Sequence, residues 1–524
     1  MLSALFDVRA FGACCDGSRL ATAAIQAAID AAAVAGGGTV YLPAGRYLSF
    51  SLRLRSRVVL HLGPGAVLEA ADPRRSAGGY DAPESNEWGD VHGYQDFGHS
   101  HFRNSLIWGE GLEDIAIVGA GRIDGAGLTR AEPRSPGEGN KAIALKLCRH
   151  VLLRDLALYR CGHFALLATG VDNLTIDNLR IDTNRDGIDI DCCRHVRISN
   201  CTVNTCNDDA IVLKSSYVLG QLRPTENVTI TNCEVTGFDP GTLLDGTFGR
   251  EKKRAPDGDG PTGRIKLGTE SNGGFRNITI CNCIFQRSRG LCLETVDGGV
   301  IEDVSVSNIV MREVSSSPIF IRLGHRARGP SDTPVGAVRR LRITGLTASG
   351  VDGRFASILA GLEGHPLCDV EIRDIHIVSR GGVRMRDVAE QPRELVNRFF
   401  LRDHPEAVGP RDPFAVPELG RAYPEPSAFG LLPAWGLYIR HARRIVLGDI
   451  TLRLEPGCSD ERVPIVLDDV DGARLEGVVA DRPAGSSLVQ MRRSRDVQLR
   501  GCGGAPDAVC DAPGDAVCAV GGRA

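Results

Sequence analysis

The sequence is poor in aromatic residues and has no long apolar run. Only 5% of its residues are aromatic, whereas it contains 63 glycines and 27 prolines, which indicates many short strands and turns rather than long amphipathic helices. A run of about 18 apolar residues, the length that crosses a bilayer as a helix, is absent, so no membrane partner is expected. The formal net charge of −4 argues against general nucleic-acid binding, which needs a basic face.

No Cys-x-x-Cys pair with zinc spacing occurs among the 17 cysteines. Cys201, Cys233 and Cys283 each follow an asparagine at the end of a repeated segment, where a small buried side chain fits a coil corner. A set of disulfides or a metal site is the alternative. We expect no cofactor and no metal.

The first residues, Met1–Val8, lack the charged start and apolar core of a secretory signal. A cytoplasmic location is therefore expected for the sequence as written, and a periplasmic or secreted one if a signal has been removed.

One local pattern, an asparagine or histidine followed by an alternating apolar run, recurs along the chain. It begins at Asn173, His195, Asn227 and Asn277, and where it is clean its period is 22 to 26 residues. This period is too short for ankyrin-type helix pairs, and the leucine-rich pattern is missing. We predict an all-β solenoid, a single-stranded parallel β-helix in which each repeat forms one coil.

We expect a single β-helix domain over residues 1–524, because each coil of a solenoid contacts only its neighbours and the stack can outgrow an ordinary core. Residues from about 1 to 50 would form an N-terminal cap and those from about 51 to 510 the coils. A capping helix is predicted at Thr22–Ala33, where apolar residues recur at helical spacing before three glycines. Such a cap covers an end strand that would otherwise pair with another molecule.

Three stretches break the period, residues 76–102, 237–263 and 380–434. In a solenoid such interruptions become loops on one face, and loops of this length are usually functional or disordered. The first stretch carries aromatic and histidine residues, namely Trp88, His92, Tyr94, His99 and His101. We expect the three loops to flank a groove or pocket above the acidic residues described next.

Two acidic clusters, Asp186–Asp191 and Asp208–Asp209, lie in successive repeats. Asp186 and Asp208 each stand 13 positions after the start of their repeat, so we expect them to stack on adjacent coils at roughly 4.8 Å. Neighbouring carboxylates raise one another's pKa, which lets one hold a proton near neutrality. Glycoside hydrolysis needs one carboxyl group to protonate the leaving oxygen and another to activate water. The three aspartates are therefore candidate catalytic residues, with calcium binding and turn capping as alternatives.

Asn184–Asp189 and Asp208–Ser216 resemble the Asn-Thr-Asp-Gly and paired-aspartate motifs of glycoside hydrolase family 28, the polygalacturonases and their relatives. Gly37–Tyr47 and Leu60–Leu68 resemble the opening of the same proteins, and the resemblance extends over about residues 6–325. It implies a right-handed parallel β-helix that hydrolyses galacturonide links with inversion.

By the same resemblance, Asp208 would be the general acid, while Asp186 and Asp209 would hold the attacking water; Asp208 and Asp209 are interchangeable in these roles. The expected partner is a pectic, uronate-containing oligosaccharide from homogalacturonan or rhamnogalacturonan. Cleavage from a chain end is expected if the long loops close one end of the groove. The sequence does not indicate an oligomeric state.

Two motifs of the family are missing. Thr262–Arg264 stands where Gly-His-Gly is expected, and Cys292–Glu294 stands where Arg-Ile-Lys would grip the substrate carboxylate. Glu294 would repel a uronate, so either the carboxylate binds elsewhere or the substrate differs. An arginine fork matches a carboxylate in bidentate geometry. The candidate substrate-binding residues are Asn184, Arg185, His163, Lys214, Arg264, Lys266, Glu270, Glu294, Arg322 and Arg326.

His163 is a candidate by position. It lies 13 positions after His150, so we expect it one coil before Asp186 in the same column.

Two other interpretations of the sequence are a β-helix lyase or glycosidase of different sugar specificity, and a non-catalytic carbohydrate-binding β-helix. Lyases of this architecture commonly depend on calcium and a basic residue and release an unsaturated product.

Overall fold

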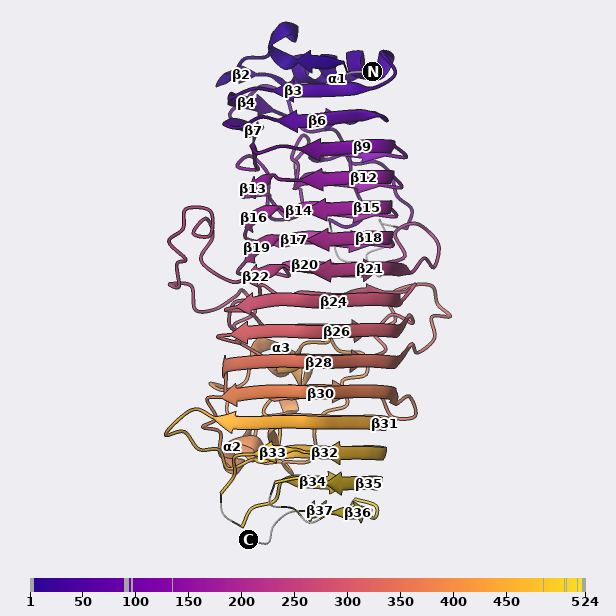
Figure 1. Cartoon of the computed structure of the whole chain (residues 1–524), viewed down its shortest axis with the longest axis vertical. Coiled ribbons are helices and arrows are strands. Elements are labelled where there is room, and N and C mark those ends of the chain that lie inside the picture. Colours follow the sequence, from indigo (N-terminus) through magenta and orange to yellow (C-terminus); the bar gives the residue numbers. More distant parts are fainter. Residues whose placement is uncertain are drawn as a thin grey trace. The chain divides into compact units, whose positions relative to one another are not determined.

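The computed structural model describes residues 4–88, 94–95, 98–133, 135–483, 485–503, 505, 507–515 and 517–520. By its internal contacts the chain divides into two compact units, Met1–Lys252 and Lys253–Ala524. Each unit is a stack of short coils (Figure 1). The single domain expected over residues 1–524 stays a prediction.

In the first unit the strands form three parallel ladders, to which each coil contributes one strand. One ladder consists of β1 (Leu5–Asp7), β3 (Gly38–Leu42), β6 (Val58–Leu62), β9 (Glu113–Val118), β12 (Arg149–Arg154), β15 (Asp172–Asp177), β18 (Arg194–Ser199) and β21 (Thr225–Thr231). The second consists of β2 (Asp16–Leu20), β4 (Gly45–Ser49), β7 (Ala66–Ala70), β10 (Arg122–Asp124), β13 (Ala157–Tyr159), β16 (Arg180–Thr183), β19 (Thr202–Thr205) and β22 (Glu234–Thr236). The third consists of β5 (Leu52–Arg53), β8 (Ser105–Glu110), β11 (Lys141–Lys146), β14 (Phe164–Thr169), β17 (Asp186–Asp191) and β20 (Ile211–Ser215). The predicted all-β parallel β-helix is confirmed.

Alternating apolar residues of the repeats form the core. In β15 Leu174 and Ile176 are buried, and Leu174 lies beside Val196 of β18, which lies beside Val228 of β21. Each such side chain stabilises the fold by about 1.5–3 kcal/mol when it leaves water.

The coil corners explain the repeated asparagines. The first residue of a repeat adopts the left-handed conformation, with φ values of 56° at Asn173, 57° at His195 and 59° at Asn227. Asparagine tolerates this region better than most residues, because its short polar side chain can hydrogen-bond locally. Cys201, Cys233 and Cys283 are buried at the next corner, as the packing interpretation expects.

The predicted capping helix is α1 (Thr22–Val34), preceded by the 3-10 helix η1 (Val8–Phe11). Ile25, Ala28, Ile29 and Ala32 form its buried face. Among the residues that the structure describes, no helix has the length and apolar character to cross a membrane.

The second unit contains longer strands in parallel ladders. One ladder consists of β24 (Phe275–Gln286), β26 (Val300–Arg312), β28 (Ala337–Val351), β30 (Leu367–Ser379), β31 (Ala434–Leu454), β32 (Val463–Glu476) and β35 (Arg495–Arg500). A second contains β23 (Ile265–Ser271), β25 (Leu291–Thr295), β27 (Ile319–Leu323) and β29 (Ser357–Ala360), continues through β31 and β32, and ends at β34 (Val489–Arg492). The short β33 (Val479–Ala480) pairs with β31, while β36 (Ala508–Cys510) and β37 (Val517–Val520) pair antiparallel with β35 and β34.

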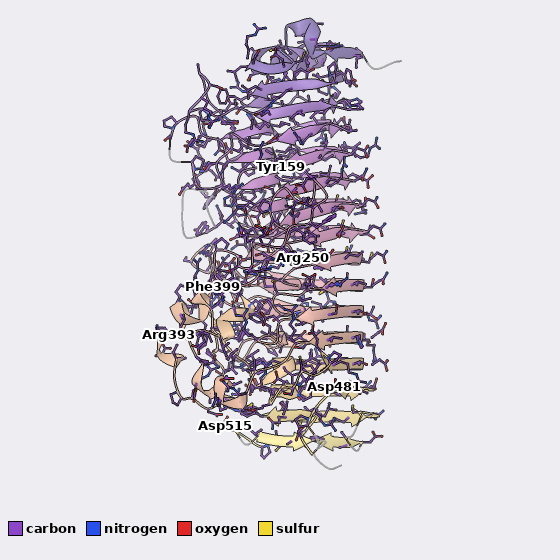
Figure 2. The ribbon with its side chains drawn as sticks, turned by 90° about the vertical axis from the view of Figure 1, so that its left-hand side faces the viewer. Tyr159, Arg250, Arg393, Phe399, Asp481 and Asp515 are labelled. Carbon is purple, nitrogen blue, oxygen red and sulfur yellow. The ribbon has the colours of Figure 1, made fainter. Side chains whose placement is uncertain are left out.

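The stretch 380–434 is partly helical rather than a simple loop. It contains α2 (Met385–Glu390), α3 (Arg398–Asp403), η2 (Pro405–Ala407) and η3 (Pro426–Phe429). Asn397 caps α3, because its side chain accepts hydrogen bonds from the N–H groups of Phe399 and Phe400. Phe399, marked in Figure 2, is buried.

Residues 237–252 belong to the first unit and are tied to it by Asp182. The Asp182 carboxylate accepts hydrogen bonds from the N–H groups of Gly241 and Leu243 at 2.8 and 3.0 Å. Arg250, marked in Figure 2, lies with its guanidinium 5.0 Å from the ring of Phe238. In the first predicted loop, 76–102, the described residues contain no strand, and His92 lies outside the described residues.

Candidate active site

The three predicted catalytic carboxyl groups lie together in the first unit. Asp186 begins β17, and Asp208 and Asp209 lie in the turn before β20. Each offers one oxygen to a group whose atoms are all within 4.8 Å of one another. Asp186 and Asp209 are buried, whereas the Asp208 side chain is 25% exposed. The cluster therefore presents one accessible carboxyl group above two buried ones.

The register of the cluster differs from the expected one by a residue. Ile188 of β17 lies opposite Ile211 of β20, and the N–H that follows Asp186 donates to the Asp209 carbonyl at 3.1 Å. Asp209, not Asp208, is therefore level with Asp186. The neighbouring strands β16 and β19 keep the 22-residue spacing, so the turn before β20 has one additional residue. That insertion places Asp208 in the turn, outside the ladder.

Asp186 and Asp208 have different electrostatic surroundings. Burial raises the pKa of Asp186 well above its ordinary value, and the nearby Asp208 carboxylate adds to the shift. The protonated form of Asp186 is therefore favoured. Asp208 has a counter-ion, since Arg185 Nη2 lies 3.0 Å from Asp208 Oδ2. Two neighbouring carboxyl groups with such different surroundings are what general acid–base chemistry needs.

His163 supports Arg185 rather than stacking on Asp186. Phe164 of β14 lies opposite Asp186, so His163 is level with Arg185, and the expected column is wrong by one residue. Arg185 Nη2 donates a hydrogen bond to His163 Nε2 at 3.2 Å. Burial lowers the pKa of His163 well below its ordinary value, and the Arg185 charge lowers it further. The ring is therefore neutral, with Nε2 as the acceptor.

His99, from the first long loop, also reaches the site, although no sequence motif gave it a role there. Its Nε2 lies 3.1 Å from Asp189 Oδ2, and a ring nitrogen falls within 4.8 Å of oxygens on both Asp186 and Asp189. The same Asp189 oxygen lies 3.9 Å from Lys214 Nζ. The only sequence signal was a histidine-rich loop, because the contact spans 90 residues of chain.

The charges at the cluster do not favour the calcium alternative. By spacing alone, both His99–Asp186–Asp189 and Asp186–Asp208–Asp209 resemble metal-binding groups. However, burial disfavours the charged form of Asp186 and raises its pKa, and the Arg185 guanidinium lies 3.0 Å from Asp208 Oδ2, an oxygen that a bound cation would need. Calcium prefers several ionised or carbonyl oxygens without competing cations.

Asn184 connects the two turns that carry the acids. Its Oδ1 accepts a hydrogen bond from Asn207 Nδ2 and another from Cys206 Sγ at 3.6 Å. Asn184 thereby holds the turn before β17 against the turn before β20.

The remaining six predicted substrate-binding residues lie in the second unit, where their side chains form ion pairs or, for Arg322, hydrogen bonds to backbone carbonyls. They are Arg264, Lys266, Glu270, Glu294, Arg322 and Arg326. Lys266 Nζ lies 3.1 Å from Glu294 Oε1, and Thr269 Oγ1 donates to the same oxygen at 3.0 Å. Glu294, expected to repel a uronate, is thus paired with a cation inside the fold.

The other cations of this set have acceptors as well. Arg264 forms a bidentate pair with Glu425 at 2.6 and 3.2 Å. Arg326 Nη2 lies 3.4 Å from Glu270 Oε1. Arg322 donates to the Gly361 carbonyl at 2.8 Å. A substrate carboxylate would have to displace a partner from any of these buried groups.

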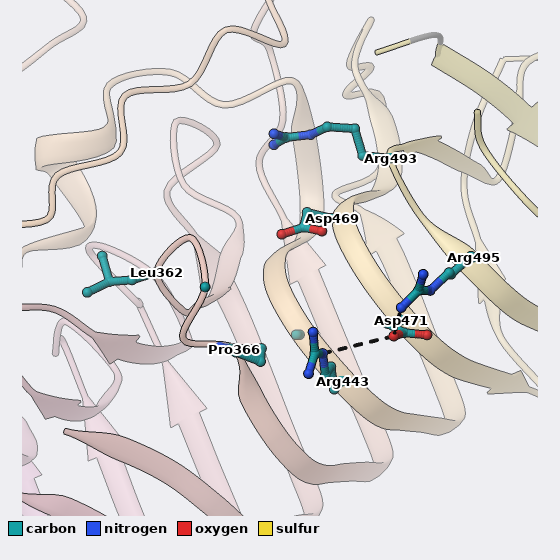
Figure 3. A pocket seen from close by; sticks show the side chains of 9 residues that line it. Leu362, Pro366, Arg443, Asp469, Asp471, Arg493 and Arg495 are labelled. Carbon is teal, nitrogen blue, oxygen red and sulfur yellow. Dashed lines mark hydrogen bonds and ion pairs between the residues drawn. The ribbon is translucent and has the colours of Figure 1, made fainter. Parts of the chain in front are cut away.

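The second unit also contains a small polar cavity of about 180 Å³, shown in Figure 3. Its lining includes Arg443, Asp469, Asp471, Arg493 and Arg495. The opposite charges are paired, with Arg495 Nη2 at 2.5 Å from Asp471. No sequence motif pointed to this cavity.

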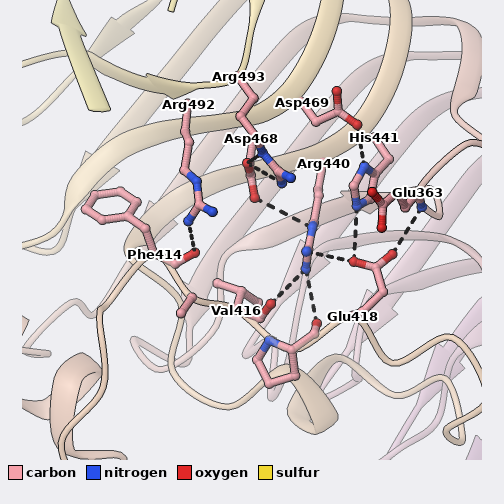
Figure 4. Close-up of polar contacts among 12 residues, drawn as sticks. Glu363, Phe414, Val416, Glu418, Arg440, His441, Asp468, Asp469, Arg492 and Arg493 are labelled. Carbon is pink, nitrogen blue, oxygen red and sulfur yellow. Dashed lines mark hydrogen bonds and ion pairs between the residues drawn. The ribbon is translucent and has the colours of Figure 1, made fainter. Parts of the chain in front are cut away.

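Beside that cavity, Arg440 holds the segment 416–418 on β31. Arg440 lies 2.7 Å from Glu418 Oε2 and donates to the Val416 carbonyl at 2.9 Å (Figure 4). His441 lies between Glu418 and Asp469, at 3.1 and 2.6 Å (Figure 4). This network fastens the partly helical stretch to the coils of the second unit.

Two family models match parts of the chain. A model described as "Right handed beta helix region" matches residues 137–249, and one described as "Rhamnogalacturonase A/epimerase, pectate lyase-like" matches residues 5–96. The β-helix is therefore right-handed, as the family resemblance implies.

Similar proteins include polygalacturonases. The chain is 25% identical over 326 residues to a protein of Vitis vinifera named "Probable polygalacturonase", and this match covers 58% of the chain and 60% of that protein. It is also 25% identical over 289 residues to the polygalacturonase of Cochliobolus carbonum, covering 52% of the chain and 69% of that protein. The resemblance to polygalacturonases is confirmed, and the low identity marks the chain as divergent.

The fold also resembles a solved structure, the hyperthermoactive exopolygalacturonase of Thermotoga maritima. The TM-score is 0.56 at 21% identity, over 72% of the chain and 87% of that protein. This likeness supports the β-helix architecture.

Proposed function

We propose that this protein is an inverting glycoside hydrolase that cleaves α-linked galacturonides or related pectic oligosaccharides from a chain end. The observation that carries the proposal is the group of three carboxyl oxygens within 4.8 Å, of which two belong to buried acids and one to an accessible acid. The similarity to polygalacturonases supports the substrate class.

In this proposal Asp208 protonates the leaving oxygen, because it is the accessible member of the group. Asp186 and Asp209, level with each other on adjacent coils, hold the attacking water. The proposal starts with the proton on Asp186, because burial raises the pKa of that carboxyl group. Its transfer to Asp208 before turnover makes Asp208 the acid and leaves Asp186 as a base, the two roles that glycoside hydrolysis requires.

The first test is product analysis. Digalacturonate, trigalacturonate and rhamnogalacturonan disaccharides are incubated with the protein and followed by proton NMR. We expect monomer released from one end with inverted anomeric configuration. Absence of cleavage, or retained configuration, contradicts the proposal. An absorbing unsaturated product that disappears with a chelator would indicate a lyase instead.

The assignment of the acid is tested with an activated substrate. Asp208→Asn should lower kcat on digalacturonate by roughly 100- to 10,000-fold, as loss of a general acid does. The same variant should retain activity on α-galacturonosyl fluoride, because fluoride leaves without protonation. Asp186→Asn and Asp209→Asn should lose both activities. If Asp186→Asn rather than Asp208→Asn retained fluoride cleavage, the roles would be reversed.

A further inference from the structure

Arg185 differs from the other cations of the predicted substrate-binding set in its accessibility. Its side chain is 31% exposed, whereas none of the other five cations exceeds 8%. The other five are Lys214, Arg264, Lys266, Arg322 and Arg326. A ligand can reach Arg185 without opening the fold.

Arg185 is also positioned in advance. Its Nη2 lies between Asp208 Oδ2 at 3.0 Å and His163 Nε2 at 3.2 Å. His163 is buried and neutral, so it orients the guanidinium without neutralising its charge. The charge is balanced by Asp208, which is itself 25% exposed. The ion pair therefore lies at the surface of the cluster, where another carboxylate can compete for it.

We propose that Arg185 binds the carboxylate of the substrate's terminal uronate, and that this exchange releases Asp208 to act as the proton donor. The inference rests on the proposed function and names the residue that selects its substrate. It also explains how a chain without the Arg-Ile-Lys motif can bind a uronate.

The exchange conserves charge, because one carboxylate replaces another on the same guanidinium. A guanidinium fork accommodates both oxygens of a carboxylate, so the incoming group forms a bond of the same kind as the one it breaks. Asp208 then has lost the cation that lay 3.0 Å from it and lies beside two other carboxyl groups, an arrangement in which a carboxyl group can accept a proton. One proton moves from the Asp186 carboxyl to Asp208, and Asp186 is left ionised.

Several charged or titratable groups surround this proton. On the acidic side they are Asp186, Asp189 and Asp209; on the basic side they are Lys214, Lys141, His99 and His163. A neutral sugar brings no carboxylate, so it leaves Arg185 paired with Asp208. The arrangement thus couples recognition of a uronate to formation of the acid.

Binding measurements test the exchange without turnover. Calorimetric titration with galacturonate and with galactose should show that wild type prefers galacturonate and that Arg185→Gln loses the preference. Asp208→Asn should bind galacturonate roughly tenfold more tightly than wild type, because it removes the internal competitor for Arg185. Asp209→Asn is the matched control, since it removes a carboxyl group of the same cluster but leaves in place Asp208, which lies 3.0 Å from the Arg185 guanidinium; its affinity should rise less. Equal affinity of Asp208→Asn and wild type would overturn the proposal.

Kinetics with a pair of substrates provide the second test. Arg185→Gln should lower kcat/KM on digalacturonate by roughly 30- to 100-fold, in line with a lost charge-assisted contact, with a much smaller effect on the methyl-esterified disaccharide. Arg185→Lys should fall between Gln and wild type, because it keeps the charge but loses the fork. Arg194→Gln removes a comparable half-exposed arginine, paired with Glu226 at 3.0 Å, and should leave both rates unchanged.

The two proposals fail in different ways. If wild type cleaves digalacturonate but Arg185→Gln slows both substrates equally, Arg185 only positions Asp208 and this inference is wrong while the hydrolase proposal stands. If wild type cleaves neither substrate, the hydrolase proposal fails. A galacturonate preference abolished by Arg185→Gln would in that case still support the binding role of Arg185.

Discussion

Asp186 is a carboxyl group that the fold buries next to two others, where its charged form is disfavoured. The core of the solenoid does not require an acid at this position, because the residue opposite it on the preceding coil, in β14, is the apolar Phe164. Asp186 therefore lowers the stability of the protein at the pH where its proposed activity operates.

We expect Asp186→Asn to be more stable than wild type near pH 7. The folded-state pKa of Asp186 is raised, so the folded state binds its proton more tightly than the unfolded chain does. The free energy of unfolding then falls by about 1.4 kcal/mol for each pH unit between about pH 4 and the raised pKa. In Asp186→Asn the free energy of unfolding does not fall in this way. The difference in stability between the variant and wild type should therefore vanish near pH 4. Urea unfolding between pH 4 and 8 measures it.

Asp332→Asn, an exposed carboxylate of a loop, controls for the change in net charge. It should follow wild type at every pH. A variant Asp186→Asn that is less stable than wild type at neutral pH would show that the ionised carboxylate is favoured in the folded state.

Residue positions were predictable from the sequence where they depend on the local repeat, and not where they depend on turn length or distant contacts. The grouping of Asp186 with Asp208 and Asp209 follows from the motifs. The one-residue shift that makes Asp209 level with Asp186 arises from an insertion in a turn, which hydrophobic periodicity does not record. His99 joins the cluster from a loop 90 residues away, and no local pattern encodes that contact.

At the scale of elements, the stretch 380–434 is attached to the second unit by buried ion pairs. Glu425 lies in this stretch, and Arg264 immediately precedes β23; both side chains are almost completely buried. Their bidentate contact leaves little room for water to replace either partner. A buried charge that loses its partner costs about 3–5 kcal/mol.

Arg264→Met and Glu425→Leu should each destabilise the protein by about 3–5 kcal/mol, because each removes one half of a bidentate buried ion pair. The double variant should recover most of that loss, since both charges are gone. Urea unfolding of the four proteins gives the coupling energy. Arg444→Ala is the control: its ion pair with Asp369 is well exposed, so the cost should be below about 1 kcal/mol. Additive single effects would mean that the two residues do not depend on each other.

The strands of this fold were predictable because each repeat forms one coil and carries the same local pattern. An asparagine occupies the corner of the coil, and alternating apolar residues follow it in the strand. The capping helix α1 was predictable for a similar reason, as its apolar spacing lies within one segment. The helices α2 and α3 are only six residues long, too short for helical periodicity to stand out. The cap at Asn397 was the available signal for α3.

At the scale of the whole molecule, the repeats predict cooperative unfolding. The stability of a solenoid is the sum of the stabilities of its coils and of the interfaces between successive coils. The unfolding of one coil therefore destabilises the coils next to it. We expect a single calorimetric transition for the full chain. Ile190→Ala in β17 and Ile343→Ala in β28, both fully buried, should each shift that transition as a whole and cost about 2–5 kcal/mol.

Two resolved transitions, with Ile190→Ala moving only one and Ile343→Ala only the other, would contradict the single-domain prediction. The chain would then consist of separate domains at residues 1–252 and 253–524.

The additional residue in the turn before β20 suggests how a β-helix can acquire new chemistry. The ladders on either side of that turn keep their pairing, so the insertion changes which side chain faces outward without disturbing the stack. Corners of the coil thus tolerate changes in length that strands do not. A lineage of such proteins can alter its reactive groups by gaining or losing single residues at corners, while point substitutions in the strands maintain the scaffold.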